Sequence, residues 1–443
     1  ARARRRDCLV RTLPAEERLV ERFGEVPRDG LDGHRLPRFR EPRVRRGGVV
    51  EPRAIAVPDV VDVHAPETRH PAHTPSTPPE TKSVPDSSGE PAPTAAGARL
   101  VTGAMLRSRA PRDDAVMPPV DHDPTMTRRV LLDTDTAGDD TMAILMAALA
   151  DSVTIEALTI VAGNVEFDHQ VANAKYTLQL AGNGDDVPVY EGARTPLVKD
   201  HEHVDHIHGD GGLGGEIYPD TGIPSADGYG PDAIVDAART HPGEVTLVCI
   251  GPLTNVALAL RREPELGDLL DDVWVMGGAV NTLGNDTPSA EYNFWVDPDA
   301  AKVVLNELDV TLVDWGLTVR QAMLEGDELA VFEESDSEYA EFFTTITEHP
   351  REFSKERLGV DATTQPDSVT VACMLEPDLV TRSNTYHVDV DEREGLTRGY
   401  SMVDELGITD GEPRTEVVEE IDADAFEEMF SDMLLHGDPE RSR

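Results

Sequence analysis

The stretch RRVLLDTDTAGDDTMAILMAALA, residues 128–150, joins a short apolar run to four aspartates that fall within eight residues. The run Val130–Leu132 is typical of a buried strand, and the apolar spacing over Met142–Leu149 favours a helix. Gly138 can supply a tight turn between the two. We therefore predict a strand, a loop of carboxylates and the first turn of a helix.

Four carboxylates at the end of a strand repel one another unless a positive charge joins them, and a hard divalent cation with oxygen ligands fits this need. They are Asp133, Asp135, Asp139 and Asp140. Helix capping and a solvated acidic face are the alternative. A DxDxT pattern after a strand is also typical of haloacid-dehalogenase-like phosphatases that use magnesium. In that reading Asp133 would be the nucleophile and Asp135 the acid and base.

From residue 128 onward apolar strands alternate with helical patterns, which predicts an α/β fold with an open, mostly parallel, Rossmann-like sheet flanked by helices. The expected strands are Val130–Leu132, Ile155–Val161, Val187–Tyr190, Val245–Ile250, Val273–Met276 and Val310–Val313. The expected helices include His169–Leu180, Pro231–Thr240, Thr254–Arg262 and Pro298–Glu307. We expect surface helices over Glu325–Leu358, two edge strands over Tyr386–Val403 and a closing helix over Asp422–Leu435. Polar clusters follow several of these strands, where ligands bind in such folds.

Charge divides the chain into two parts. Residues 1–127 carry 21 basic and 19 acidic side chains, whereas residues 128–443 carry 19 and 66, a net charge of −47. Such an acidic, lysine-poor surface argues against nucleic-acid binding. Adaptation to a salty cytoplasm is the simplest explanation, because salt screens the repulsion. Residues 1–127 are rich in Pro, Arg and Ala and lack apolar periodicity, so we expect a disordered extension or a start site placed too far upstream.

The three cysteines, Cys8, Cys249 and Cys373, give no disulfide framework and no CxxC motif. We therefore expect a reducing, cytoplasmic location. No apolar run is as long as a membrane span, and no apolar segment follows the N-terminal arginines, so we expect neither membrane insertion nor a secretory signal.

Further motifs follow in order: VAGN (161–164), IHGDGGLGG (207–215), GPLTN (251–255), VWVMGGAV (273–280), GNDTPSAEYNFWVDPDAA (284–301) and PDSVTVACMLEPDLV (366–380). With DTDTAGDD, these make residues 128–443 resemble the inosine–uridine-preferring nucleoside hydrolases. The resemblance implies the nucleoside hydrolase fold, hydrolysis of ribonucleosides to ribose and free nucleobase in purine or pyrimidine salvage, and a homodimer or homotetramer.

The resemblance also implies a calcium ion held by Asp135, Asp140, the backbone carbonyl of Thr254 and Asp367. Calcium takes several hard oxygens, backbone carbonyls included. Asp135 would also be the general base that activates water, and Asp133 would support the loop from behind. On residue chemistry alone, the Thr254 side chain is more typical of a helix N-cap, and Asp367 fits an ordinary turn equally well.

The expected ribose-binding side chains offer the donors and acceptors that a sugar diol needs, and one thioether would form an apolar wall. They are Asp139, Asn164, Asn285, Glu291, Asn293 and Met276. Many family members have a histidine immediately before the late metal aspartate, to protonate the leaving base. Here that position is Pro366, so His208 becomes the candidate acid, beside an alternative role in shaping its loop. Asp314 is also expected near the base.

Two other functional classes remain open. One is the phosphatase described above. The other is a catalytically weakened nucleoside-binding protein, which Pro366 suggests. The His-x-His pair His201 and His203 would suit zinc, but no further ligand spacing supports it.

If salt screening stabilises the acidic part of the chain, dilution from molar KCl to about 0.1 M should lower its unfolding temperature and its helical circular dichroism, because screened charges repel again. Thermal unfolding at a series of KCl concentrations measures this effect. Unchanged stability in dilute buffer would contradict the salt-adaptation hypothesis.

Overall fold

The computed structural model describes residues 127–184 and 186–442. The chain divides into the units Ala1–Ser108 and Arg109–Arg443, and the described residues all belong to the second. The prediction of disorder for 1–127 therefore falls almost entirely outside the described residues.

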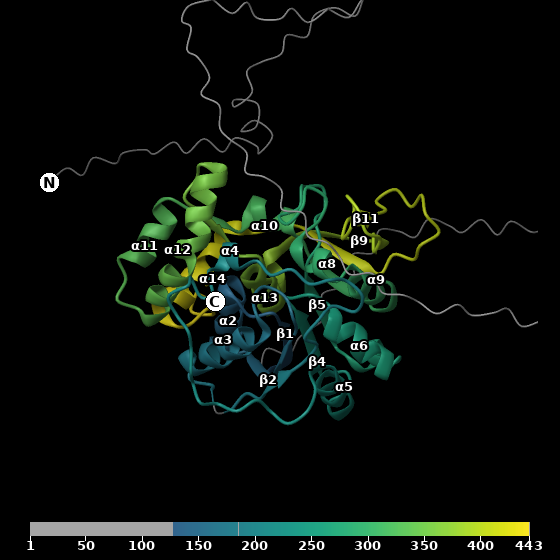
Figure 1. The fold of residues 1–443 in the computed structure, drawn as a ribbon, viewed down its shortest axis with the longest axis horizontal. Helices are drawn as coiled ribbons and strands as arrows, with labels where there is room; N and C mark the ends of the chain where they lie inside the picture. The colour runs from purple at the N-terminus through teal and green to yellow at the C-terminus, as the bar shows by residue number, and fades with distance from the viewer. Residues whose placement is uncertain (1–126, 185, 443) are drawn as a thin grey trace, which may run out of the picture. The chain divides into compact units, whose positions relative to one another are not determined.

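An eight-stranded sheet forms the centre of the second unit (Figure 1). Its order is β3–β2–β1–β4–β5–β6–β12–β9, and every neighbouring pair is parallel except β12 with β9. The strands are β1 (Arg128–Thr134), β2 (Val153–Ile160), β3 (Val189–Glu191), β4 (Val245–Cys249), β5 (Asp272–Met276), β6 (Val310–Val313), β9 (Val380–Tyr386) and β12 (Thr415–Ile421). The mostly parallel sheet confirms the predicted fold class.

Helices cover both faces of the sheet, so its central strands are buried on each side (Figure 1). On β1, Val130 and Leu132 join one apolar cluster while Leu131 joins the other. The first cluster contains side chains of α2 (Gly138–Leu149), α3 (Phe167–Leu180), α12 (Glu338–Leu358), α13 (Pro366–Leu375) and α14 (Ala423–His436). The second contains side chains of α5 (Gly230–Thr240), α6 (Thr254–Arg262), α7 (Leu266–Leu269) and α9 (Pro298–Glu307). Burial on two faces explains why the strands read as continuous apolar runs.

The strand order reverses direction between β1 and β4. The chain runs outward from β1 through β2 to β3, then returns to β4 on the other side of β1. In an open parallel sheet, the loops leaving two such strands diverge and open a crevice at their carboxyl ends. The DTDTAGDD loop leaves β1 at this point, and the GPLTN segment leaves β4 beside it.

The C-terminal region differs from the prediction of two edge strands over Tyr386–Val403. The edge strand is β9, which ends at Tyr386, and β10 (Val388–Val390) and β11 (Ser401–Val403) form a separate antiparallel pair. Strand β12 lies between β6 and β9 and is not among the predicted strands. Its sequence, TEVVEEI, carries three glutamates and reads as a surface segment. The closing helix is present as α14.

The remaining elements are short or lie outside the main sheet. They are α4 (Asp205–His208), α8 (Tyr292–Val296), α10 (Trp315–Gln321), α11 (Asp327–Glu333), a 3-10 turn at Pro377–Leu379, and the antiparallel pair β7 (Met323–Glu325) and β8 (Ala362–Thr364). Helices α11 and α12 fill the predicted helical region Glu325–Leu358. None of the helices in 127–184 and 186–442 combines the length and apolarity of a membrane span.

Candidate functional site

Asp135 lies at the centre of the site, in the loop between β1 and α2, and it is fully buried. Its Oδ2 accepts a hydrogen bond of 2.9 Å from the Asn164 backbone amide. Its Oδ1 is buried without a hydrogen-bond partner in the protein. A Cβ atom placed on Gly163 would lie 1.8 Å from Asp135 Oδ2, and one on Gly251 would lie 2.7 Å from Oδ1. Glycines on two neighbouring loops therefore allow the backbone to close around this carboxylate.

Asp140 and Asn164 extend the cluster on one side. Asp140 sits in the first turn of α2, where its carboxylate accepts from the hydroxyl of Thr134 at 2.6 Å and the amide of Ala137 at 3.0 Å. The Asn164 side-chain amide donates to Asp140 Oδ2 at 3.1 Å. Asn164 therefore holds Asp135 through its backbone and Asp140 through its side chain.

Asp367 reaches the cluster from a distant part of the sequence, in the first turn of α13. Carboxylate oxygens of Asp139, Asp140 and Asp367 lie within 4.8 Å of one another. In the described part of the chain this is the one group of three or more His, Cys, Asp or Glu side chains placed to hold a metal. Asp139, expected to bind ribose, thus lies among the possible ligands, while Asp135 adjoins the group.

The electrostatics of the cluster show the same need for a cation. Burial raises the pKa of Asp140 to about 7, and the charge of Asp139 adds to the effect. The pKa values of Asp135 and Asp367 are also raised, first by burial and then by the neighbouring aspartates. Together with the unpartnered Oδ1 of Asp135, this all-oxygen donor set fits a hard divalent cation, which would favour the ionised forms.

Thr254 begins α6, but its side chain does not cap that helix. Its hydroxyl donates instead to Asp297 Oδ2 at 2.6 Å. Asp297 also accepts from the amides of Leu197 at 2.8 Å and Ala300 at 3.0 Å, so it ties α6, α9 and a loop together. The expected N-cap role of the Thr254 side chain is therefore wrong. The group of Thr254 that the resemblance assigns to the metal is its backbone carbonyl.

Asp133 lies near the carboxyl end of β1, and one of its oxygens accepts hydrogen bonds from two polar side chains. Its Oδ1 accepts from Thr159 at 2.5 Å and from the Asn255 side chain at 2.7 Å, and the whole residue is buried. Burial raises the pKa of Asp133 to about 7. These contacts hold Asp133 between β2 and α6, while its Oδ2 is buried without a hydrogen-bond partner in the protein. The contact fits the expected supporting role.

Glu291, Asn293 and Met276 lie at the ends of β5 and α8. Glu291 caps α8, and its carboxylate accepts from the backbone amides of Gly278 and Asn293 at 2.8 Å each. Burial raises the pKa of Glu291 to about 7. The Asn293 side chain contacts the carbonyl and the sulfur of Met276 at 3.4 Å each. The structure therefore brings these three residues together. The charge of Glu291 also raises the pKa of Asp367.

Asn285 and Asp314 differ from the other expected substrate contacts. Asn285 is exposed, and its Oδ1 accepts from the Tyr292 amide at 2.9 Å, which orients the start of α8. Asp314 caps α10 and accepts from three backbone amides. Its side chain is engaged with the backbone, and the expected contact to the base stays a prediction.

His208 ends α4, with its Nδ1 3.9 Å from Asp139 Oδ1. That nitrogen is buried and has no hydrogen-bond partner. Burial lowers the pKa of His208, and the charge of Asp139 opposes the change. The imidazole is therefore mostly neutral near pH 7 and lies beside the aspartate cluster.

His201 and His203 do not form a metal site. His201 Nε2 and His203 Nδ1 both contact the carbonyl oxygen of Gly163, at 2.8 and 3.1 Å. Among the described residues, no group of three or more possible metal ligands includes either ring. The zinc alternative therefore has no support from this geometry.

Three residues of the site were not predicted, although all lie within motifs that the sequence displays. Asn255 holds Asp133, Asp297 holds Thr254, and the Tyr292 hydroxyl contacts the Gly163 carbonyl at 2.9 Å. The sequence signal for these residues is a polar group inside an otherwise apolar segment. Such a group, when buried, seldom lacks a hydrogen-bond partner.

Known proteins share this architecture. A pyrimidine-specific ribonucleoside hydrolase, RihB, from Escherichia coli O157:H7 is 33% identical over 300 residues, which is 68% of this chain and 94% of the relative. The structure of a plant nucleoside hydrolase, PpNRh1, matches with a TM-score of 0.65 and 30% identity, covering 70% of this chain and 99% of that one. A purine-preferring ribonucleoside hydrolase from Gardnerella vaginalis matches with a TM-score of 0.63 and 29% identity, covering 68% and 96%.

A family model described as inosine-uridine preferring nucleoside hydrolase matches residues 130–428, which hold the whole aspartate cluster and the strands that carry it. The chain belongs to the inosine-uridine preferring nucleoside hydrolase family, and is a hydrolase of ribonucleosides.

Proposed function

We propose that this chain hydrolyses the N-glycosidic bond of ribonucleosides with the help of a calcium ion, held by Asp135, Asp140, Asp367 and the Thr254 carbonyl. The observation that carries the proposal is the buried aspartate cluster at the β1–β4 reversal, with the unpartnered Oδ1 of Asp135. Calcium suits a site of several carboxylates and a carbonyl in flexible geometry. When bound, it would favour ionised carboxylates, acidify the attacking water and bind the ribose diol.

Asp135 is the proposed general base. Its Oδ2 is fixed by the Asn164 amide, which leaves Oδ1 to take the proton of the attacking water. Burial and the nearby aspartates raise the pKa of Asp135, and a bound cation would keep the carboxylate ionised and able to accept the proton. Attack at the anomeric carbon then proceeds through an oxocarbenium-like state.

The ribose contacts are proposed for Asp139, Asn164, Glu291 and Asn293, with Met276 as an apolar wall. Glu291 is held by backbone amides, so it can stabilise positive charge on the ribose without reorganising. Asn285 is proposed to act indirectly, because its contact is the Tyr292 amide.

The substrate class is tested by measuring ribose release from inosine, uridine, adenosine and cytidine in high salt, with and without a calcium chelator. We expect release from at least one nucleoside, its loss after chelation and its recovery with added calcium. Asp135→Asn should fold normally and lose about 10³-fold or more of the rate, because the water then lacks its base.

Phosphate release from a phosphomonoester would support the phosphatase instead. Calcium-dependent nucleoside binding without ribose release would support the weakened binding protein. Activity that survives chelation unchanged would contradict the metal site.

His208 is the proposed acid for the departing base, because Pro366 occupies the position where many family members have a histidine. Pro366 is buried at the first position of α13, where its missing amide costs no helical hydrogen bond. His208 lies beside Asp139, whose charge favours the protonated imidazole.

If His208 protonates the leaving base, His208→Ala should slow natural nucleosides by about 10²-fold or more, yet barely slow a 4-nitrophenyl riboside, whose leaving group needs no proton. The control is His206→Ala, which removes an exposed histidine of the same short helix. Steady-state rates on both substrates measure the difference. Equal slowing of both would place His208 in binding.

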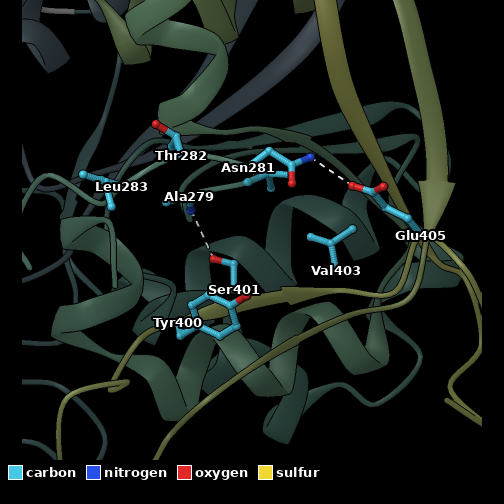
Figure 2. A pocket seen from close by; sticks show the side chains of 9 residues that line it. Ala279, Asn281, Thr282, Leu283, Tyr400, Ser401, Val403 and Glu405 are labelled. Carbon is cyan, nitrogen blue, oxygen red and sulfur yellow. Dashed lines mark hydrogen bonds between the residues drawn. The ribbon is translucent and has the colours of Figure 1, made fainter. Parts of the chain in front are cut away.

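A homo-oligomer is also proposed, and a surface hollow favours one contact face. The hollow, of about 450 Å³, lies between the segment Ala279–Leu283 and the segment Tyr400–Glu405 (Figure 2). Next to it Leu406 and Ile408 are 81% and 80% exposed. Leu283 and Tyr400 are also exposed, by 70% and 46%, so large apolar side chains occur on both segments that form the hollow.

A second copy fits this face because the hollow and the protruding side chains occur on one surface, as a two-fold contact requires. Ala279, which lines the hollow, follows Gly278 in the chain, and the Gly278 amide donates to Glu291. We expect the chain to elute in high salt with at least twice the mass of one copy. The double variant Leu406→Asp with Ile408→Asp should have the mass of a monomer.

Val331→Asp is the matched control, since Val331 is an exposed valine on α11, far in sequence from Leu406 and Ile408. Light scattering after size exclusion gives the masses. A monomeric wild-type chain, or a double variant that keeps its full mass, would contradict this contact.

The proposed location is the cytoplasm. The support is that Cys249 and Cys373 are buried free thiols, a state that a reducing compartment maintains.

A further inference from the structure

One peptide link, between Gly163 and Asn164, connects Asp135 to a loop of histidines. Its amide, on Asn164, donates to Asp135 Oδ2 at 2.9 Å. Gly163 packs so closely on the same carboxylate that a Cβ atom there would lie 1.8 Å from Oδ2. A small rotation of this link would therefore move the hydrogen bond that fixes Asp135.

The carbonyl of the same link points the opposite way, as in any trans peptide. The Gly163 oxygen lies 2.8 Å from His201 Nε2, 3.1 Å from His203 Nδ1 and 2.9 Å from the Tyr292 hydroxyl. Burial lowers the pKa of His201, which favours a neutral ring that donates through one nitrogen. Three polar groups from two separate segments thus converge on one carbonyl.

Tyr292 joins these segments. It is buried, it begins α8 between Glu291 and Asn293, and its hydroxyl also lies 2.9 Å from the carbonyl oxygen of Glu202. Both neighbours are acceptors, so the single hydroxyl proton is shared between Gly163 and the histidine loop, residues 201–208. This loop has a second attachment, because the Val204 amide donates to the Asn164 carbonyl at 2.8 Å.

We propose that Tyr292 is a positioning residue, which acts with His201 and His203 to hold the Gly163–Asn164 link so that its amide stays on Asp135. The proposal rests on the role of Asp135 proposed above. Donors on a peptide carbonyl also polarise the link and strengthen its amide as a donor.

The substitution Tyr292→Phe tests the proposal because it removes the hydroxyl and keeps the packed ring. Backbone hydrogen exchange over residues 161–166 and 201–208 should become about 2–10-fold faster, as expected for the loss of one hydrogen bond. With a hydrolysed nucleoside, kcat should fall by about 10-fold while KM changes less than about 2-fold, because the ribose contacts remain.

The matched control is Tyr386→Phe, which removes a hydroxyl bonded to Glu419 at 2.7 Å on the edge strand β9. It should leave exchange at 161–166 and both kinetic constants unchanged. Exchange in Tyr292→Phe that equals wild type would overturn the proposal, whatever happens to kcat. Exchange is measured with calcium and with chelator and needs no turnover, so it decides this proposal even if no ribonucleoside is hydrolysed.

Discussion

Repulsion among buried carboxylates is the constraint around which this structure is arranged. Asp135, Asp140 and Asp367 are buried together, and each has a raised pKa through burial and the charge of its neighbours. Backbone amides and the side chain of Asn164 reduce this cost, but hydrogen bonds do not remove the net charge. Repulsion within this arrangement destabilises the fold, and a divalent cation bound to the carboxylates would offset that repulsion.

The sheet delivers the groups that surround the cluster. Asp135 follows the last residue of β1, the segment after β2 supplies Asn164, and the segment after β4 supplies Thr254. Because these strands are parallel neighbours, segments far apart in sequence leave the sheet at one edge. Close approach then depends on glycines, since a side chain at Gly163 or Gly251 would collide with Asp135.

The residues proposed to bind the ribose and the residue proposed to protonate the base differ in how firmly the fold holds them. The ribose half consists of buried groups fixed by backbone amides, as for Glu291. The group proposed to protonate the base is His208, on a four-residue helix within the histidine loop. Pro366, at the start of α13, occupies the position where many family members have a histidine. Short elements of this kind have low local stability, which suits a region that admits the substrate and releases the base.

Local pattern determined most of the fold. Apolar runs buried on two faces identified six of the sheet's strands, and the aspartates after Leu132 identified the site, because burial and repulsion act over a few residues. Tertiary structure decided what depended on distant partners. Strand β12 carries glutamates and becomes a strand only between β6 and β9. Asn255 meets Asp133 across 122 residues, and Tyr292 meets Gly163 across 129. The sequence contains these polar groups, but only folding brings each donor to its acceptor.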